Sequence, residues 1–156
     1  MNITDFHLNF FSLQGKSALV TGGNSGLGRA FALALAKAGA DVFVVSIIED
    51  DQEIRSLVEA EGVQYGFMCA DITEEGVAAQ AVSGCQQTFG AIDILVNSAG
   101  ISLLAEVQEF GRDQWDKMLS VNLTAAFELS AIAAKQMIQQ GSGKIINHVI
   151  GALFKS

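Results

Sequence analysis

The chain has 156 residues, of which half are apolar and 17% are charged, and its formal net charge is −8. This length fits one domain, residues 1–156, with a sizeable core, and the composition argues against disorder. The acidic balance disfavours a nucleic-acid partner, whose phosphates would be repelled, and does not help binding to an anionic membrane surface.

No apolar run reaches the roughly 18 residues that a membrane helix needs, so we expect no membrane partner. The first nine residues have no basic segment and include Asp5, unlike a signal peptide, which favours a cytoplasmic protein. Cys69 and Cys85 are too few and too far apart for a disulfide framework or a zinc site, so we expect no metal.

Along the chain, short apolar runs alternate with longer segments of helical spacing. We expect strands at Ser17–Thr21, Asp41–Ser46, Gln64–Cys69, Ile92–Asn97 and Lys144–Val149. We expect helices at Leu27–Ala38, Asp51–Glu61, Glu74–Phe89 and Gln114–Gln140, the last with room for a break. The near-continuous apolar strands are typical of parallel strands covered on both faces. The pattern predicts an α/β fold, a doubly wound parallel sheet of the Rossmann type with about five strands.

The first helix is expected to face the sheet with one apolar stripe. Its members would be Leu27, Phe31, Ala34, Leu35 and Ala38.

The segment Thr21–Gly28 joins the first strand to the first helix with the spacing G-x-x-x-G-x-G. Glycines let the backbone bend and approach a ligand, and a helix N-terminus offers free N–H groups and a partial positive charge to an anion. The segment therefore predicts a phosphate cradle. In a sheet of this kind, the ligand crevice lies at the carboxyl ends of the strands.

Five separate stretches share one order and spacing, and together the chain resembles the short-chain dehydrogenase/reductase family. They are TGGNSGLG (21–28), ADIT (70–73), DILVNSAG (93–100), VNL (121–123) and GKIIN (143–147). The resemblance covers Lys16 to Asn147. Within the family, it has a closer likeness to bacterial sugar-acid dehydrogenases of the 2-dehydro-3-deoxy-D-gluconate 5-dehydrogenase type.

The resemblance implies a nicotinamide cofactor and assigns residues to it. The turn residues Gly22, Asn24, Ser25, Gly26, Leu27 and Gly28 would hold the pyrophosphate, and Ser46 would stand near the adenosine ribose. Asp71 and Ile72 would lie beside the adenine, and Asn97, Ala99 and Gly100 would flank the cofactor ribose. Asn122 corresponds to the family's catalytic asparagine, which holds a helix kink and a water in the proton relay.

Three of these residues have structural alternatives that stay open. Asp71 could cap a helix that starts near Glu74, with Thr73 competing for that position. Asn97 could simply end a strand, and Asn122 could be a hydrogen-bonded structural residue. We expect Trp115, Met118, Leu119 and Phe127 to form core or subunit contacts.

The end of the second strand bears on the choice of cofactor. Family members that use NAD often carry an acidic residue where this chain has Ser46. No Arg or Lys lies nearby to pair with the 2′-phosphate of NADP, however, and Glu49, Asp50 and Asp51 would repel it. NAD is therefore favoured over NADP.

The family's proton transfer uses a serine, a tyrosine and a lysine together with the asparagine. The serine position is Ile150 here, the Tyr-x-x-x-Lys pair would lie beyond Ser156, and Tyr65 stands in the third strand. The pattern ends abruptly after Asn147, which suggests an N-terminal fragment produced by a frameshift or premature stop. We expect such a fragment to be inactive; the alternatives are a nucleotide-binding pseudoenzyme or assembly module and a piece that binds nothing.

Without the residues that follow Asn147 in the family pattern, Lys144–Val149 would be an edge strand and the last helix would be partly uncovered. We expect self-association into a homo-oligomer, or a tail in which Ile150, Leu153 and Phe154 cover that surface. The implied substrate of the full-length relatives is a small sugar acid.

Overall fold

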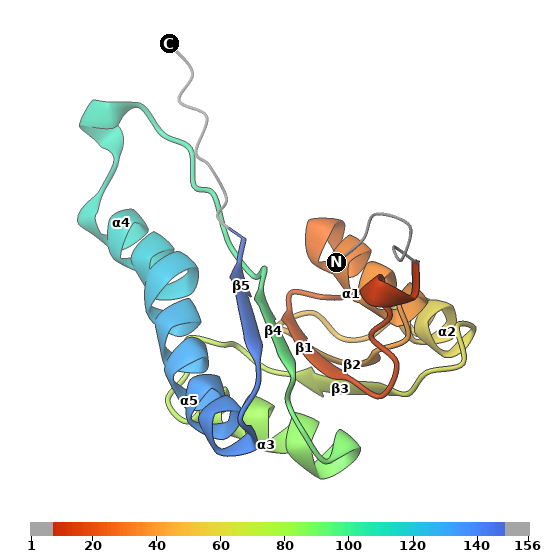
Figure 1. The fold of residues 1–156 in the computed structure, drawn as a ribbon. Coiled ribbons are helices and arrows are strands. Elements are labelled where there is room, and N and C mark those ends of the chain that lie inside the picture. The colour runs from red at the N-terminus through yellow and green to blue at the C-terminus, as the bar shows by residue number, and fades with distance from the viewer. Residues whose placement is uncertain (1–7, 149–156) are drawn as a thin grey trace.

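The structure of the protein is a computed structural model, and it describes residues 8–148. Five parallel strands form one sheet in the order β3-β2-β1-β4-β5 (Figure 1). They are β1 (Ser17–Thr21), β2 (Asp41–Ser46), β3 (Tyr65–Cys69), β4 (Ile94–Asn97) and β5 (Lys144–Asn147). In the central strand, Val20 pairs with Val44 of β2 and with Val96 of β4. The predicted parallel sheet is confirmed.

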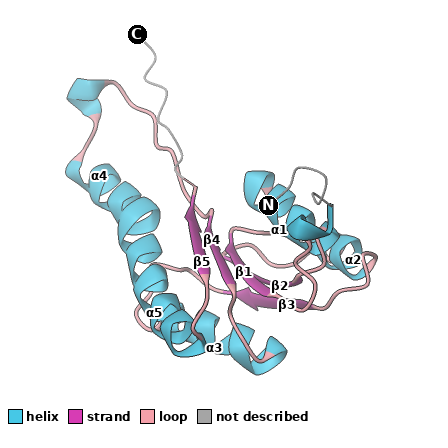
Figure 2. Cartoon of the chain, viewed as in Figure 1, coloured by secondary structure: helices cyan, strands magenta, loops and turns pink. Residues whose placement is uncertain are grey.

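Helices cover both faces of the sheet (Figure 2). Helices α1 (Gly26–Lys37) and α2 (Glu53–Glu59) lie on one face, and α3 (Val77–Phe89) and α5 (Ala125–Gln140) lie on the other. Helix α4 (Arg112–Leu119) precedes α5 and extends beyond the carboxyl ends of the strands. The described residues also form two short 3-10 helices, η2 (Leu8–Phe11) and η3 (Val107–Glu109).

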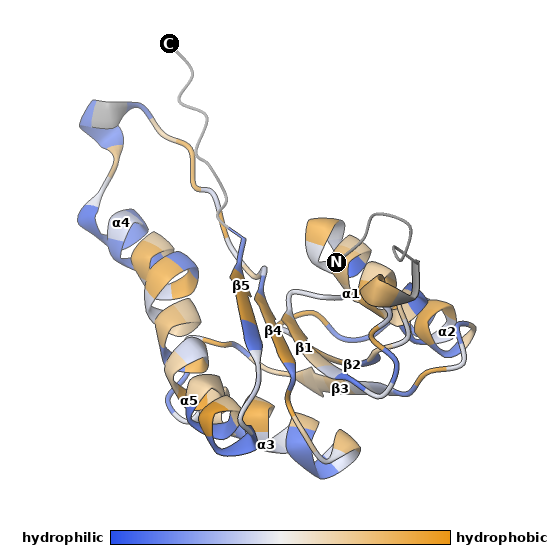
Figure 3. Cartoon of the chain, in the orientation of Figure 1, coloured by the Kyte–Doolittle hydropathy of each residue, from blue (hydrophilic) through white to orange (hydrophobic). Residues whose placement is uncertain are grey.

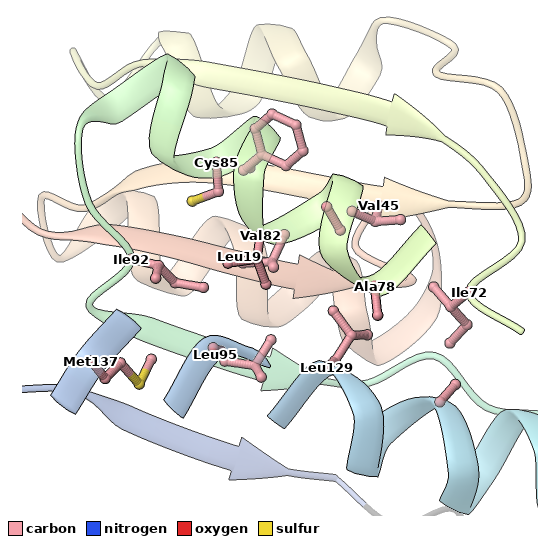
Figure 4. Packing of buried hydrophobic residues seen from close by; sticks show 14 residues of the cluster. Leu19, Val45, Ile72, Ala78, Val82, Cys85, Ile92, Leu95, Leu129 and Met137 are labelled. Atoms are coloured by element: carbon pink, nitrogen blue, oxygen red, sulfur yellow. The ribbon is translucent and has the colours of Figure 1, made fainter. Parts of the chain in front are cut away.

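Each face of the sheet has its own apolar cluster because successive strand residues point to opposite sides. Leu19 and Leu95 pack with Val82 of α3 and Leu129 of α5, all nearly or fully buried (Figure 4). Val20 and its strand neighbours pack on the other side against α1 and α2. The inner strands β1, β2 and β4 are accordingly hydrophobic over most of their length (Figure 3).

Helix α1 presents a different face to the sheet from the one predicted. Its buried residues are Gly28, Ala32 and Ala36, whereas Leu27 is 60% exposed. Phe31 and Leu35 lie at the edge of this face and pack against the cluster. The helix is apolar on most sides, so its periodicity is ambiguous, and the smallest side chains take the position closest to the sheet.

Several helices and strands are shorter than predicted. Helix α3 begins at Val77 and not at Glu74, because Gly76 ahead of it has φ +82°, which no helical residue has. Helix α2 is confined to Glu53–Glu59, and β4 begins at Ile94. Val149, the predicted end of the last strand, lies outside the described residues.

The long predicted helix over 114–140 does contain a break. A π-helical turn, η4 (Ser120–Thr124), separates α4 from α5 and includes Asn122. No residue of α4 is buried. Trp115 and Phe127 are 51% and 70% exposed. The prediction that these residues belong to the core was therefore wrong for both of them.

Candidate functional site

A cavity of about 720 Å³ opens at the carboxyl ends of the strands, where the strand order reverses beside β1. It is bounded by the glycine turn, the ends of β2 and β3, the segment after β4, and α4 with η4. Its lining consists of Gly22, Ser25–Gly28, Val45–Ile48, Ala70–Ile72, Ser98–Ile101, Lys117, Val121 and His148. This is the position at which open α/β sheets bind ligands.

The glycine turn is shaped by two close approaches of backbone to backbone. Gly22 has φ +65°, and a Cβ on it would lie 3.1 Å from Ala99 Cα. A Cβ on Gly28 would overlap the carbonyl oxygen of Gly22. Glycine at both positions lets the turn fold tightly under the first turn of α1, whose N–H groups have no partners within the helix. The turn can therefore present these groups to an anion.

The segment after β4 is held against β1 by one hydroxyl. Thr21 Oγ1 accepts hydrogen bonds from the backbone N–H groups of Ser98 and Ala99, both at 3.0 Å. Thr21 is 1% exposed, so these bonds are shielded from water. They place Ala99 and Gly100 at the cavity beside Gly22. The sequence analysis did not assign this role to Thr21.

Asn97 ties β4 to its neighbours instead of facing the cavity. Its Nδ2 donates to Asn147 Oδ1 of β5 at 2.7 Å and to Ser130 Oγ of α5 at 3.0 Å. A longer contact of 3.4 Å reaches the carbonyl oxygen of Ala126. Because its side chain joins two strands and a helix, Asn97 does more than end a strand.

Asp71 closes a turn at the far end of the cavity. Its Oδ1 accepts hydrogen bonds from the Thr73 hydroxyl at 2.7 Å and the Thr73 N–H at 2.9 Å. These bonds, the hydroxyl first, lower the pKa of Asp71, and the charge of Lys117 acts in the same direction. The predicted alternative of a cap on a helix starting near Glu74 was wrong, because that helix begins three residues later.

Asn122 lies in the π-helical turn and binds one backbone unit twice. Its Oδ1 accepts from Ile101 N–H at 2.9 Å, and its Nδ2 donates to the Ile101 carbonyl oxygen at 2.8 Å. The widened turn thus secures the segment that leaves β4. The oxygen and the nitrogen of the Asn122 amide are therefore both hydrogen-bonded to the backbone. This is the structural role that the sequence analysis left open for Asn122.

Most of the predicted cofactor residues meet at one cavity. Ten of them line it: Gly22, Ser25, Gly26, Leu27, Gly28, Ser46, Asp71, Ile72, Ala99 and Gly100. Asn24, Asn97 and Asn122 do not line it. Asn24 instead donates from Nδ2 to the carbonyl oxygen of Ile48 at 2.7 Å, holding the turn to the loop after β2.

Sequence reasoning missed several lining residues, among them Ile47, Ile48, Lys117 and His148. Lys117 precedes the VNL motif by four residues, about one helical turn, which is the one signal that could have placed it near the site. The described part of the chain contains no cluster of side chains suited to a metal, and both cysteines are free. Within residues 8–148, no helix has the length and apolarity that crossing a bilayer requires.

The profile of the short chain dehydrogenase family matches residues 16–152. The chain belongs to this family. The chain is 56% identical over 146 residues to an Escherichia coli K12 protein called uncharacterized oxidoreductase YgcW, covering 94% of this chain and 56% of that protein. It is 41% identical over 141 residues to 2-dehydro-3-deoxy-D-gluconate 5-dehydrogenase from Dickeya dadantii, covering 90% and 55%. The chain thus spans about half the length of the curated relatives it matches.

Solved structures of proteins in this family share the fold of this chain. NAD⁺-bound xylitol dehydrogenase matches with a TM-score of 0.80 at 32% identity, over 85% of this chain and 52% of that one. NADPH-dependent 3-quinuclidinone reductase from Rhodotorula rubra matches with a TM-score of 0.84 at 29% identity, over 93% and 56%. Members of the family use a nicotinamide cofactor. The glycine cradle and the adjacent helix N-terminus of this chain fit the phosphates of such a group.

Proposed function

We propose that this chain binds NAD in the 720 Å³ cavity and forms the cofactor-binding part of an oxidoreductase that acts on a sugar acid. One observation carries the proposal. The tight turn at Gly22–Gly28 lies in the same cavity as Ser46, Asp71, Ile72 and Ala99–Gly100, although these residues come from four separate stretches of sequence. A glycine turn that matched the motif by chance would not be expected to lie beside the other motif residues.

Each group of residues would hold one part of the dinucleotide. The N–H groups at the start of α1 would bind the pyrophosphate, Ser46 would stand at the adenosine ribose, and Asp71 with Ile72 would flank the adenine. Ala99 and Gly100 would lie along the second ribose. When bound, the nicotinamide ring accepts or supplies a hydride. The residues described here bind and orient that cofactor.

Charge near the end of β2 favours NAD over NADP. Ser46 is 5% exposed and its Oγ accepts a hydrogen bond from Ile48 N–H at 3.2 Å, so it leaves little room for a 2′-phosphate. The nearest arginines are already paired, Arg29 with Glu53 and Arg55 with Asp50. The exposed carboxylates of Glu49 and Asp51 would repel a further negative charge.

Calorimetric titration tests the proposal directly. We expect NAD to bind chain 1–156 with a dissociation constant in the micromolar range and NADP to bind about tenfold more weakly, a difference of about 1.4 kcal/mol. Absence of heat with either nucleotide would contradict cofactor binding. Equal affinities would contradict the NAD preference alone.

The sugar-acid class is supported by the similarity to 2-dehydro-3-deoxy-D-gluconate 5-dehydrogenase. The proposed reaction moves a hydride between the nicotinamide and a hydroxyl or keto group of the substrate. Chain 1–156 should not perform it, because its single tyrosine, Tyr65, is buried at the start of β3. Ile150, at the family's serine position, lies outside the described residues. Measurable turnover of gluconate-type substrates by the pure chain would contradict this part.

The exposed face of η4 and α5 supports the proposed homo-oligomer. Leu123, Phe127 and Ile138 share one side of the helix and are 61%, 70% and 78% exposed. Glu128 and Lys135 flank this stripe on one side, seven residues apart. An antiparallel pairing of two copies would bury the stripe and set each glutamate opposite the other copy's lysine. The alternative cover, formed by Ile150, Leu153 and Phe154, lies outside the described residues.

Sedimentation velocity checks this pairing. We expect Phe127→Asp to weaken association by about tenfold or more, because it places a charge in an apolar contact. The single charge reversals Glu128→Lys and Lys135→Glu should each weaken association, and the double reversal should restore it. Association through the exposed edge of β5 would instead be unaffected by all four variants.

A further inference from the structure

The loop between β2 and α2, residues 47–52, forms one wall of the cavity. Its side chains Ile47 and Ile48 line the cavity and are 68% and 60% exposed. Apolar burial does little to fix this wall, because most of the surface of both side chains stays in contact with solvent. The position of the wall therefore depends on polar contacts of the loop.

The hydrogen bonds formed inside the loop are local. Near its start, the N–H of Ile48 donates to Ser46 Oγ at 3.2 Å. Near its end, the N–H of Gln52 donates to Asp50 Oδ1 at 3.0 Å. Each bond joins residues two positions apart, so it shapes a turn and does not fix the loop relative to the rest of the site.

Asn24, from the glycine turn, binds the loop from outside. Its Nδ2 donates to the carbonyl oxygen of Ile48 at 2.7 Å and, at a longer distance of 3.4 Å, to that of Glu49. From the end of β3, Cys69 Sγ donates to the carbonyl oxygen of Ile47 at 3.7 Å, and a thiol is a weak donor. The bond from Asn24 to Ile48 is the shorter and stronger of these two connections.

The Asn24 amide serves this contact as a donor. Its Nδ2 makes both bonds, whereas its Oδ1 is buried and has no hydrogen-bond partner among the described residues. A buried acceptor without a donor is unfavourable, so the value of an amide at this position lies in its nitrogen. Asn24 does not line the cavity, so its nitrogen acts on the loop.

The glycine turn and the loop face different parts of the proposed ligand. The start of α1 would bind the pyrophosphate, and Ile47 and Ile48 directly follow Ser46, which would stand at the adenosine ribose. Because pyrophosphate and adenosine are joined covalently, one ligand makes both sets of contacts only when turn and loop are at the matching distance. A distance that is fixed before binding avoids the cost of ordering the loop at binding.

We propose that Asn24 is a positioning residue for the cofactor. Its hydrogen bond to the carbonyl oxygen of Ile48 keeps the wall formed by Ile47 and Ile48 at a fixed distance from the glycine turn, and this raises the affinity for the adenosine end of the ligand. The inference rests on the proposed NAD site and deepens it, because it names a residue outside the cavity lining that determines the affinity of the site.

Calorimetry with NAD and with ADP-ribose, which lacks the nicotinamide, tests the inference. We expect Asn24→Ala to raise both dissociation constants by about fivefold, the equivalent of one hydrogen bond. Ile48→Ala removes part of the wall itself and should have an effect of about the same size. The double variant should bind less than about tenfold more weakly than the wild type, because Asn24 acts through the position of Ile48. Independent effects would instead multiply to about 25-fold.

Gln140→Ala is the matched control for lost stability. The Gln140 amide also binds backbone: Nε2 donates to the Ile92 carbonyl oxygen at 3.0 Å, and Oε1 accepts from the Ile92 N–H at 3.3 Å. Neither Gln140 nor Ile92 lines the cavity. This variant should lower the free energy of unfolding at least as much as Asn24→Ala and leave the affinity for both nucleotides unchanged.

Hydrogen exchange of the loop amides, measured without nucleotide, reports on the loop directly. Exchange at residues 47–50 should be faster in Asn24→Ala than in the wild type and unchanged in Gln140→Ala. Asn24→Asp keeps the size of the side chain, but a carboxylate has no hydrogen to donate to a carbonyl oxygen. Its loop should therefore exchange at least as fast as that of Asn24→Ala. Wild-type exchange rates in Asn24→Asp would overturn the inference, because the amide nitrogen would then not hold the loop.

The affinities separate this inference from the proposed function. With a wild type that binds, unchanged affinity in Asn24→Ala would overturn this inference alone. Effects of Asn24→Ala and Ile48→Ala that multiply in the double variant would do the same. A wild type that binds neither nucleotide would overturn the proposed function and this inference with it.

Discussion

Replacing Gly28 with alanine is expected to reduce NAD affinity by about 100-fold, or about 2.7 kcal/mol. A Cβ at this position would overlap the carbonyl oxygen of Gly22 and come within 2.8 Å of its carbonyl carbon. These are backbone atoms, so no side-chain rotation can relieve the clash. The turn would have to move away from α1 and would lose the geometry that presents N–H groups to the phosphates. Overpacking of this kind also costs about 1–3 kcal/mol of stability.

Gly111→Ala is the matched control for this experiment. Gly111 precedes α4, has φ −76°, and an added Cβ would meet nothing closer than Gln114 Oε1 at 3.7 Å. This variant should keep the wild-type affinity for NAD and nearly the wild-type stability. Calorimetry and urea unfolding of both variants give the comparison. A Gly28→Ala protein that binds NAD normally would show that the turn is not the phosphate cradle.

Thr21→Val is expected to destabilise the fold by about 3 kcal/mol, because two buried N–H groups lose their acceptor and each such loss costs about 1–3 kcal/mol. The substitution keeps the shape of the side chain, so packing changes little. The N–H groups belong to Ser98 and Ala99, which lie directly ahead of Gly100 at the cavity. Urea unfolding measures the stability, and NAD affinity should fall by about tenfold as this segment loosens.

Thr21→Ser keeps the hydroxyl and removes only a methyl group. It should recover most of the lost stability and nearly all of the NAD affinity. Hydrogen exchange at the amides of Ser98 and Ala99 should be fast in the valine variant and slow in the serine variant. Equal behaviour of the two variants would mean that the hydroxyl does not hold the segment after β4.

The strands were predicted to within about two residues at the ends that the structure describes, because each is a short, mostly apolar run bounded by turn residues. The helices were predicted less well at their first turns. Nothing in the residues 74–76 forbids a helix, and only the conformation of Gly76 in the folded chain delays α3 to Val77. The face of α1 was misassigned for a related reason, since an almost uniformly apolar helix carries no periodic signal.

For the site, the motifs predicted which segments meet but not which side chains face the cavity. Asn24, Asn97 and Asn122 all stand in motif positions, yet none of them lines the cavity. Asn24 and Asn122 bind the backbone of lining residues, and Asn97 binds a neighbouring amide. Thr21 begins the TGGNSGLG stretch, but the motif does not reveal that its hydroxyl binds the segment after β4, and Lys117 lies outside the motifs. Their importance depends on residues that are close only after folding.

The sequence by itself determined the α/β class, the parallel sheet and the glycine turn, because these follow from local spacing and from the conformations that single residues permit. The tertiary structure decided which loops share one cavity, which helix face is buried, and which side chains secure the loops around the site. Those features depend on contacts between residues far apart in the chain, such as Thr21 with Ala99 and Asn97 with Asn147. The residue pattern of a short segment does not predict such contacts, because their free energy arises only when packing excludes water from the groups involved.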